Sequence, residues 1–304
     1  MSSAFFTHWL KRRRETGRLG LEIREDGLAW ASWEAGRPAD AGVIVCTPAE
    51  RLSALKQLVA GKAPTCQTVR LVLSPNQYQV FQLERPEGVD ESELADALRW
   101  KLRDLIDFSA SDAVCDVFPF PSDASRGRGE LVNVVVARQD RLAGYVSLVH
   151  DAGLDLESID IAHLALRNAA EALDADERGL ALVHLREDAG QMVICRGATL
   201  YLSRRLDVVA DHLSDAARQD DAIQSLALEM QRSLDYFESQ LGQAPPRTVV
   251  IAGQDPAMPL APMLSPYVGV GVEALDPERL AAPRDLDARC LPALGVVCPA
   301  GASV

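Results

Sequence analysis

The chain has 304 residues, a length that indicates about two domains. Of these residues 48% are hydrophobic and 25% are charged, a composition typical of folded globular proteins. Its formal net charge of -13 disfavours general binding to nucleic acid, because neutralising phosphates requires a basic surface. The six cysteines form no C-x-x-C pair, so they indicate neither a zinc site nor a disulfide framework. We interpret them as small buried hydrophobic residues of a protein in the reducing cytoplasm.

The N-terminal segment, residues 1–18, combines apolar residues with a basic run. This order can give a short amphipathic helix that lies against an anionic membrane surface or a partner, and the alternative is a frayed, solvated terminus. No stretch approaches the roughly 20 apolar residues that a membrane-spanning helix needs, so membrane association would be peripheral. The residues concerned are Phe5, Phe6, Trp9, Lys11, Arg12, Arg13 and Arg14.

One order of strand and helix patterns occurs twice along the chain, which predicts two halves of similar topology. The predicted first half, residues 19–165, begins with strands at 19–23, 28–33 and 42–46, a helix at 49–59 and a strand at 69–73. The predicted second half, residues 166–304, has strands at 180–185, 191–195 and 199–203, a long helix ending near residue 241 and a strand at 248–251. An apolar segment at 291–297, despite its proline, is expected to be the last part of the core.

An insertion at about residues 86–137 interrupts the first half. Asp90 is a candidate helix N-cap with Glu93 in the capping-box position, and an apolar face follows. That face is formed by Leu94, Leu98, Leu102 and Leu105. Strands are predicted at 113–118 and 131–136, and the polar, glycine-containing loop at 122–129 between them is expected to be a mobile hairpin tip. A helix at 138–152 and a strand at 154–161 lead to the second half.

Three segments resemble PilM-type pilus assembly proteins of the actin-like ATPase superfamily: LERPEGVDESELADALRWKLRDLIDFSASDAVCDVF, GLDLESIDIAHLALRNA and LALEMQRSLDYFESQ. The resemblance spans roughly residues 19–297. It implies an α/β actin-like ATPase fold, with ribonuclease H-like duplicated halves and the inserted subdomain of the PilM and FtsA type. It also implies a place on the cytoplasmic face of the inner membrane, in a pilus assembly platform beside the assembly ATPase. The implied partner is the cytoplasmic tail of a PilN-like bitopic membrane protein.

The two phosphate-binding turns of that superfamily are altered in this chain. Actin-like ATPases hold nucleotide between the halves with turns of the form D-x-G, whose glycine lets backbone N–H groups approach the phosphates. Here Glu22 and Arg24 stand at the ends of the first trio, and His184 and Arg186 at the ends of the second. Each arginine occupies volume that a phosphate needs, and acidic residues follow both turns. The alternative is that the two guanidinium groups pair with phosphate, which retains nucleotide binding but not hydrolysis.

The adenosine side of the implied pocket is also reduced. Gly253 stands alone where the superfamily favours successive glycines, and Glu229 and Arg232 match the helix that passes near the sugar and base. Glu229 and Arg232 can also pair with each other at i, i+3. We interpret these residues as relics of a degenerate nucleotide pocket. No P-loop, G-x-S-x-G or H-E-x-x-H motif is present, so the sequence indicates no catalytic residues, no metal site and no required cofactor.

Three hypotheses follow from the sequence. The first is a non-catalytic scaffold of an MSHA-type or type IV pilus platform, which holds the membrane protein's tail in a groove between the first subdomain and the insertion that carries Trp100. The second is a nucleotide-binding ATPase that switches platform assembly, with ATP and magnesium in the cleft. The third is a polymerising actin homologue of the cell-division type. ATP titration with phosphate release separates the first two, and sedimentation with nucleotide tests the third.

Overall fold

The computed structural model describes residues 17–298 apart from residues 128, 174–175, 189, 254 and 256. The predicted amphipathic segment, with Phe5 to Arg14, lies outside the described residues. No helix within the described ranges is both long and apolar enough to span a membrane.

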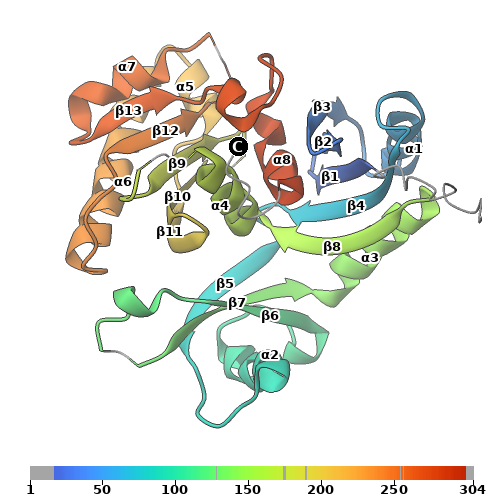
Figure 1. Cartoon of the computed structure of the whole chain (residues 1–304), viewed down its shortest axis with the longest axis horizontal. Helices are drawn as coiled ribbons and strands as arrows, with labels where there is room; N and C mark the ends of the chain where they lie inside the picture. Colours follow the sequence, from blue (N-terminus) through green and yellow to red (C-terminus); the bar gives the residue numbers. More distant parts are fainter. Residues whose placement is uncertain are drawn as a thin grey trace, which may run out of the picture.

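The first sheet has five strands in the order β3-β2-β1-β4-β8 (Figure 1). Its first three strands form an antiparallel meander, and the last two run parallel to β1. The strands are β1 (Gly17–Ile23), β2 (Gly27–Glu34), β3 (Arg37–Val45), β4 (Cys66–Leu73) and β8 (Asp155–Ile161). The helices α1 (Arg51–Gly61) and α3 (Gln139–Asp151) contribute Leu55, Leu58 and Val149 to the core beneath this sheet. Strands β1 and β2 and most of β4 are buried, whereas β3 and β8 at the edges of the sheet are partly exposed.

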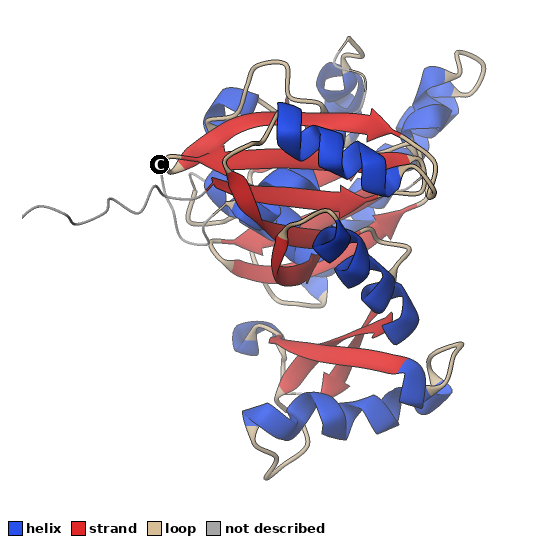
Figure 2. Ribbon diagram, turned by 90° about the vertical axis from the view of Figure 1, so that its right-hand side faces the viewer, coloured by secondary structure: helices blue, strands red, loops and turns tan. Residues whose placement is uncertain are grey.

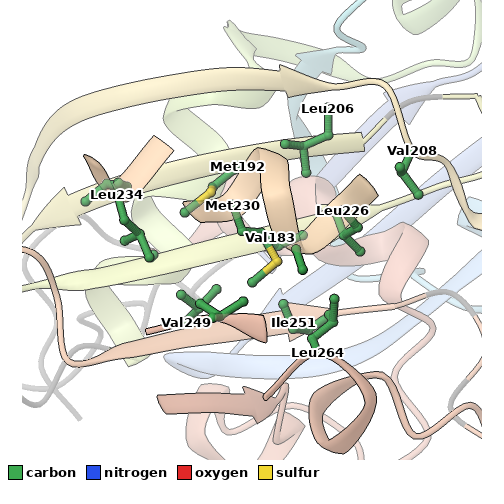
Figure 3. Packing of buried hydrophobic residues seen from close by; sticks show 14 of the residues in the cluster. Val183, Met192, Leu206, Val208, Leu226, Met230, Leu234, Val249, Ile251 and Leu264 are labelled. Carbon is green, nitrogen blue, oxygen red and sulfur yellow. The ribbon is translucent and has the colours of Figure 1, made fainter. Parts of the chain in front are cut away.

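The second sheet repeats this topology in the order β11-β10-β9-β12-β13. Its strands are β9 (Leu180–Leu185), β10 (Gly190–Arg196), β11 (Thr199–Leu206), β12 (Thr248–Ala252) and β13 (Gly271–Ala274). The long helix α6 (Gln219–Ser239) packs its apolar stripe against β9, β10 and β12, with Leu226, Met230 and Leu234 next to Val183 and Val249 (Figure 3). The short helices α5 (Ala210–Ser214) and α7 (Leu260–Leu264) complete this core. The predicted duplication is confirmed.

Two helices lie between the sheets and join the halves. Helix α4 (Ala162–Leu173) follows the first sheet and packs on β9 and β10 of the second. Helix α8 (Leu291–Val297), at the end of the described chain, is buried along its whole length and packs back on β1, β2 and β4 (Figure 1). The approach is close, since a Cβ on Gly295 would lie 2.0 Å from the Ala165 carbonyl oxygen. Residues 291–297 are therefore core, as predicted.

A third, smaller sheet forms the insertion, with strand order β5-β7-β6 and the helix α2 (Glu91–Arg99) on one face (Figure 2). Its strands are β5 (Tyr78–Glu84), β6 (Ala113–Pro119) and β7 (Leu131–Arg138). Strand β5 precedes residue 86, where the sequence placed the start of the insertion. The sheet therefore has a strand that sequence reasoning missed.

The apolar face of the insertion helix is shorter than predicted. Leu94, Leu98 and Leu102 are buried against the third sheet, but Leu105 is 51% exposed. The chain changes to 3-10 geometry at Trp100–Asp104, which shifts the following side chains off the helical stripe. The predicted side-chain cap is also wrong, because Asp90 makes no side-chain cap hydrogen bond and only its carbonyl accepts the N–H of Glu93.

The loop between β6 and β7 is docked, so the predicted mobile hairpin tip is wrong. Ala124 is fully buried in the core of the second half. Beside it, the Tyr201 hydroxyl donates to Asp123 at 2.9 Å, and the Gln243 amide donates to the same carboxylate at 3.2 Å. Arg126 donates to the carbonyl of Ser239 at the end of α6. We call this contact the clasp; it joins the insertion to the second half.

Candidate functional site

The two turns that sequence reasoning singled out meet at the centre of the molecule. Arg24 follows β1 of the first sheet, and Arg186 follows β9 of the second, in equivalent positions of the repeated topology. Both arginines are almost completely buried, with 3% and 2% of their surface exposed. A buried guanidinium needs partners for its N–H groups, and here the partners are protein carboxylates.

Each arginine crosses to a carboxylate of the opposite half. Arg24 Nη2 lies 2.8 Å from Glu187 Oε2, although the two residues are 163 positions apart in the sequence. Arg186 Nη1 donates to Oε1 of Glu22, which is fully buried at the end of β1. The two acids do not occupy equivalent positions, since Glu22 lies two residues before Arg24 and Glu187 lies one residue after Arg186. We call these two contacts the crossed pair; they link the two halves across the cleft.

Each arginine also binds an acid of its own turn. Arg24 Nε lies 2.9 Å from Asp26 Oδ1, and Arg186 Nη2 lies 3.1 Å from Asp188 Oδ1. Burial acts to lower the pKa of Arg24, but hydrogen bonds to Asp26 and Glu187 outweigh it and leave the pKa above its ordinary value. Burial of Arg186 is likewise outweighed, mainly by the charges of Glu22 and Asp188, so its pKa is also raised. Both arginines therefore stay charged.

Glu22 is positioned by the first sheet as well as by Arg186. The Ser74 hydroxyl, just after β4, donates to Glu22 Oε1 at 2.6 Å. Two polar atoms of this cluster, Glu22 Oε2 and Arg24 Nη1, are buried without a hydrogen-bond partner among the described residues. Arg186 is the direct ion-pair partner of this carboxylate, and the charge of Arg24 also acts on it.

His184, the remaining residue of the two predicted turns, is buried, and its ring binds another part of the protein. Its Nε2 donates to the carbonyl oxygen of Ala288 at 2.8 Å. Burial, reinforced by the nearby charge of Arg186, lowers its pKa to about 3. The ring is therefore neutral at physiological pH and holds the segment before α8 against β9.

Gly253 lies in the second half, in a cavity that has no described lining residue from the first half. It lines this cavity of about 310 Å³ together with Leu185, Asp211, Asp255 and Arg289. Arg289 connects this cavity to the turns, since its Nη1 lies 3.2 Å from Glu187 and its Nη2 lies 2.6 Å from Asp287. The one guanidinium among the lining residues is therefore already paired with two carboxylates.

Glu229 and Arg232 lie apart from Gly253. They line a separate surface pocket of about 540 Å³ on α6. The predicted pair between them is wrong: no ion pair in the described ranges joins them, and Glu229 instead accepts the N–H of Asp207 at 2.9 Å. Burial raises the pKa of Glu229. The structure therefore divides the predicted pocket residues into three groups.

The guanidinium groups around the turns are already paired with carboxylates. Three arginines are balanced against five carboxylates: Arg24, Arg186 and Arg289 against Glu22, Asp26, Glu187, Asp188 and Asp287. A phosphate that reached the guanidinium groups would displace these carboxylates and leave them unpaired beside a tetra-anion. No group of His, Cys, Asp or Glu side chains in the described part of the chain has the arrangement of a metal site.

Sequence reasoning identified both arginines and Glu22, but it missed the ion pairs that they form. It noted Asp26, Glu187 and Asp188 only as added negative charge, and it did not single out Ser74 or Arg289. The repeat itself held part of the signal, because the same tripeptide, Arg-Glu-Asp, follows the first strand in both halves. Partners more than 100 residues apart cannot be paired from local patterns.

Comparison with known proteins gives matches to solved structures but none to family models or curated sequences. No protein-family model and no curated protein matches the chain. Among solved structures, a PilM-PilN type IV pilus biogenesis complex aligns with a TM-score of 0.72 and 21% identity, covering 93% of this chain and 98% of that one. The cytoplasmic domain of EpsL, an inner-membrane component of the type II secretion system of Vibrio cholerae, aligns with a TM-score of 0.53 and 14% identity, covering 92% and 94%.

A protein of unknown function from Bacteroides thetaiotaomicron with an actin-like ATPase fold gives a TM-score of 0.54 at 9% identity, covering 92% of this chain and 96% of that one. All three likenesses extend over almost the whole of both chains. Together with the repeated five-stranded sheets, they establish that this chain has the actin-like ATPase fold.

Proposed function

We propose that this chain is a non-catalytic scaffold in the cytoplasmic part of a pilus assembly platform, of the MSHA or another type IV kind, or of a related secretion system. Its partner would be the cytoplasmic tail of a PilN-like bitopic inner-membrane protein. Within the PilM-like proteins, we propose that this chain is of the MshI kind, the MSHA pilus biogenesis protein, on the basis of the three sequence segments named above. The likeness to a PilM-PilN complex over nearly the whole chain supports this class of partner.

The observation that carries the non-catalytic part is the crossed pair. In an actin-like ATPase the two turns approach the phosphates, and here they are joined to each other by Arg24–Glu187 and Arg186–Glu22. Opening the site for ATP would break two buried charge contacts before any nucleotide contact formed. The same contacts hold the halves together, so the fold needs no ligand to close the cleft.

A groove between the insertion and the first half supports tail binding. It has a volume of about 330 Å³ and a mainly apolar lining from β6, β7, β8, α3 and α4. Val114 and Phe118 lie on the insertion side, and Ile159 and Leu164 on the side of the first half. A groove between two apolar walls, one of them the edge strand β6, suits an extended peptide that contributes alternate side chains.

The second candidate function is a nucleotide-binding ATPase that switches platform assembly. The cavity at Gly253 favours it, because it lies next to the turns and has room for a base and sugar. Titration with ATP and magnesium, followed by thermal shift and phosphate release, separates the two. We expect no shift and no release above buffer; saturable stabilisation with turnover would replace the scaffold proposal.

Tail binding has a direct test with a matched pair of variants. Val114 and Val146 are exposed to the same extent, at 42% and 43%, but only Val114 lines the groove. We expect Val114→Glu to abolish binding of a PilN-like tail peptide in calorimetry and Val146→Glu to leave it unchanged. Equal affinities for both variants would place the tail elsewhere.

We also propose that residues 1–18 hold the protein at the inner membrane, through Phe5, Phe6 and Trp9 and the basic run that follows. Flotation with vesicles that contain anionic lipid tests this. Loss of flotation on removal of residues 1–16 is expected, and flotation that is unaffected by this deletion would contradict it.

A further inference from the structure

The groove proposed for the tail is apolar except for two carboxylates, Asp160 at the end of β8 and Asp116 in the middle of β6. They stand on opposite walls, one on the first half and one on the insertion. Each accepts the backbone N–H of the residue that follows it, at 2.7 Å for Asp160 and 2.8 Å for Asp116. Neither takes part in an ion pair within the described residues.

The arginines nearest to Asp160 are engaged elsewhere. Arg70 and Arg167 both act on Asp160 electrostatically, but Arg70 Nη2 donates to Glu157 at 2.6 Å and Arg167 Nη2 donates to Asn168 at 2.6 Å. Burial raises the pKa of Asp160, and the charge of Asp116 adds to this effect. A carboxylate that is partly desolvated and lacks a cation gains free energy when a ligand brings one.

The tail of a bitopic inner-membrane protein is a suitable source of that cation. Short cytoplasmic segments beside a membrane span carry an excess of lysine and arginine. An apolar tail would fill the groove but leave both carboxylates desolvated and unpaired, which would cost affinity.

We propose that Asp160 and Asp116 are specificity residues that recognise one lysine or arginine of the bound tail, with apolar residues on both sides of it in the groove. This inference rests on the proposed function, because it assigns a role to residues of the same groove. Tail recognition would then depend on a charged contact as well as on apolar contacts.

The test uses synthetic peptides of the cytoplasmic tail of a PilN-like protein, and the same peptides with each lysine or arginine replaced in turn by norleucine. Asp160→Asn and Asp116→Asn keep the backbone hydrogen bond through the amide oxygen. Asp155→Asn is the matched control, since Asp155 lies on the same strand and does not line the groove. Calorimetry measures the dissociation constants.

We expect one norleucine replacement to weaken binding roughly tenfold or more, and Asp160→Asn to weaken the unmodified peptide by a similar factor. The two losses should not add when combined, and Asp155→Asn should change nothing. If the tail binds wild type and Asp160→Asn equally while Val114→Glu abolishes binding, the groove is right and the charge reading is wrong. If no tail peptide binds wild type, the proposed function itself fails.

Discussion

Arg24 and Arg186 occupy equivalent positions, yet their removal leaves different groups behind. Loss of Arg186 leaves Glu22 fully buried without an ion pair, with the Ser74 hydroxyl as a hydrogen-bond donor and the charge of Arg24 nearby. Loss of Arg24 leaves Glu187 and Asp26, whose side chains are 27% and 45% exposed and can be solvated. We therefore expect Arg186→Met to lower the free energy of unfolding by about 3 to 5 kcal/mol and Arg24→Met by clearly less.

Urea denaturation of both variants, and of Glu22→Gln combined with Arg186→Met, measures this difference. The double variant should recover a large part of the loss, because it removes the stranded charge. If Arg186→Met were no more destabilising than Arg24→Met, the buried Glu22 would not depend on Arg186.

His184 gives the molecule a sensitivity to acid. Its pKa is about 3 in the folded chain and near 6.5 when unfolded, so below pH 6.5 the unfolded state binds a proton that the folded state does not. Stability should therefore be level above pH 6.5 and fall by about 1.4 kcal/mol per pH unit for this group as the pH falls toward 3. His163, whose pKa burial lowers to about 4, acts in the same direction.

The change that isolates His184 is His184→Gln, whose amide can still donate to the Ala288 carbonyl. Its unfolding free energy, measured between pH 7 and pH 4.5, should fall less steeply than that of wild type. The difference in slope should correspond to about one proton fewer taken up on unfolding. His150→Gln on α3, where the side chain is 87% exposed, is the control and should follow wild type. A wild-type slope in His184→Gln would show that this ring does not titrate on unfolding.

The sequence predicted which residues alter the phosphate turns, because a change from glycine to arginine is a local fact. It could not predict whether each guanidinium would face a phosphate or a carboxylate, since that depends on contacts between halves. Glu229 shows the same limit. Its spacing on the helix permits an ion pair with Arg232, but the sequence does not show that the backbone N–H of Asp207 is close enough to bind the carboxylate instead.

At the scale of elements, the tight packing of α4 and α8 between the sheets depends on two glycines. An added Cβ would lie 2.0 Å from the Ala165 carbonyl oxygen at Gly295 and 1.8 Å from the Ala293 carbonyl oxygen at Gly20. We expect Gly295→Ala and Gly20→Ala each to destabilise the protein by about 3 kcal/mol or more, because backbone atoms must move in both cases.

Gly144 is the matched control for this pair. It lies inside α3, and an added Cβ there would meet nothing within 4 Å. Gly144→Ala should stabilise by about 0.5 to 1 kcal/mol through helix propensity. Thermal unfolding of the three variants checks the pattern, and a mild effect of Gly295→Ala would mean that α4 and α8 are not closely packed.

Most elements could be predicted because period-two and helical patterns are strong in the duplicated halves. Strand β5 was missed because its sheet partner β7 begins at Leu131, far along the chain, so no hairpin signal marks it. The loop at 122–129 was misjudged for a related reason. Its polar, glycine-containing sequence is typical of a solvated turn, and only the three-dimensional structure shows that Ala124 enters the core of the second half.

At the scale of the whole molecule, polar contacts add to the packing of α4 and α8 in joining the halves: the crossed pair between the turns, and the clasp from the insertion. Actin-like folds commonly open and close about the cleft between their halves, and domain closure needs free energy from a ligand when the protein does not supply it. Because the crossed pair is made by the protein's own charges, we expect the halves to stay closed without a ligand. In the proposed scaffold, fixed halves would keep the groove beside the insertion in one shape.

Closure without ligand predicts that charge reversal opens the cleft and that nucleotide has no effect on it. Arg24→Glu places like charges beside Glu187, which should speed amide hydrogen exchange in both turns several-fold and increase the radius of gyration in X-ray scattering. Adding Glu187→Arg restores the pair in reverse and should return both readings most of the way to wild type. Arg138→Glu, which breaks the exposed pair with Asp140 on the insertion side, should leave the turns protected.

ATP with magnesium should change none of these exchange profiles. Protection of the turns by ATP in wild type would mean that nucleotide displaces the crossed pair and that the cleft still works as a switch.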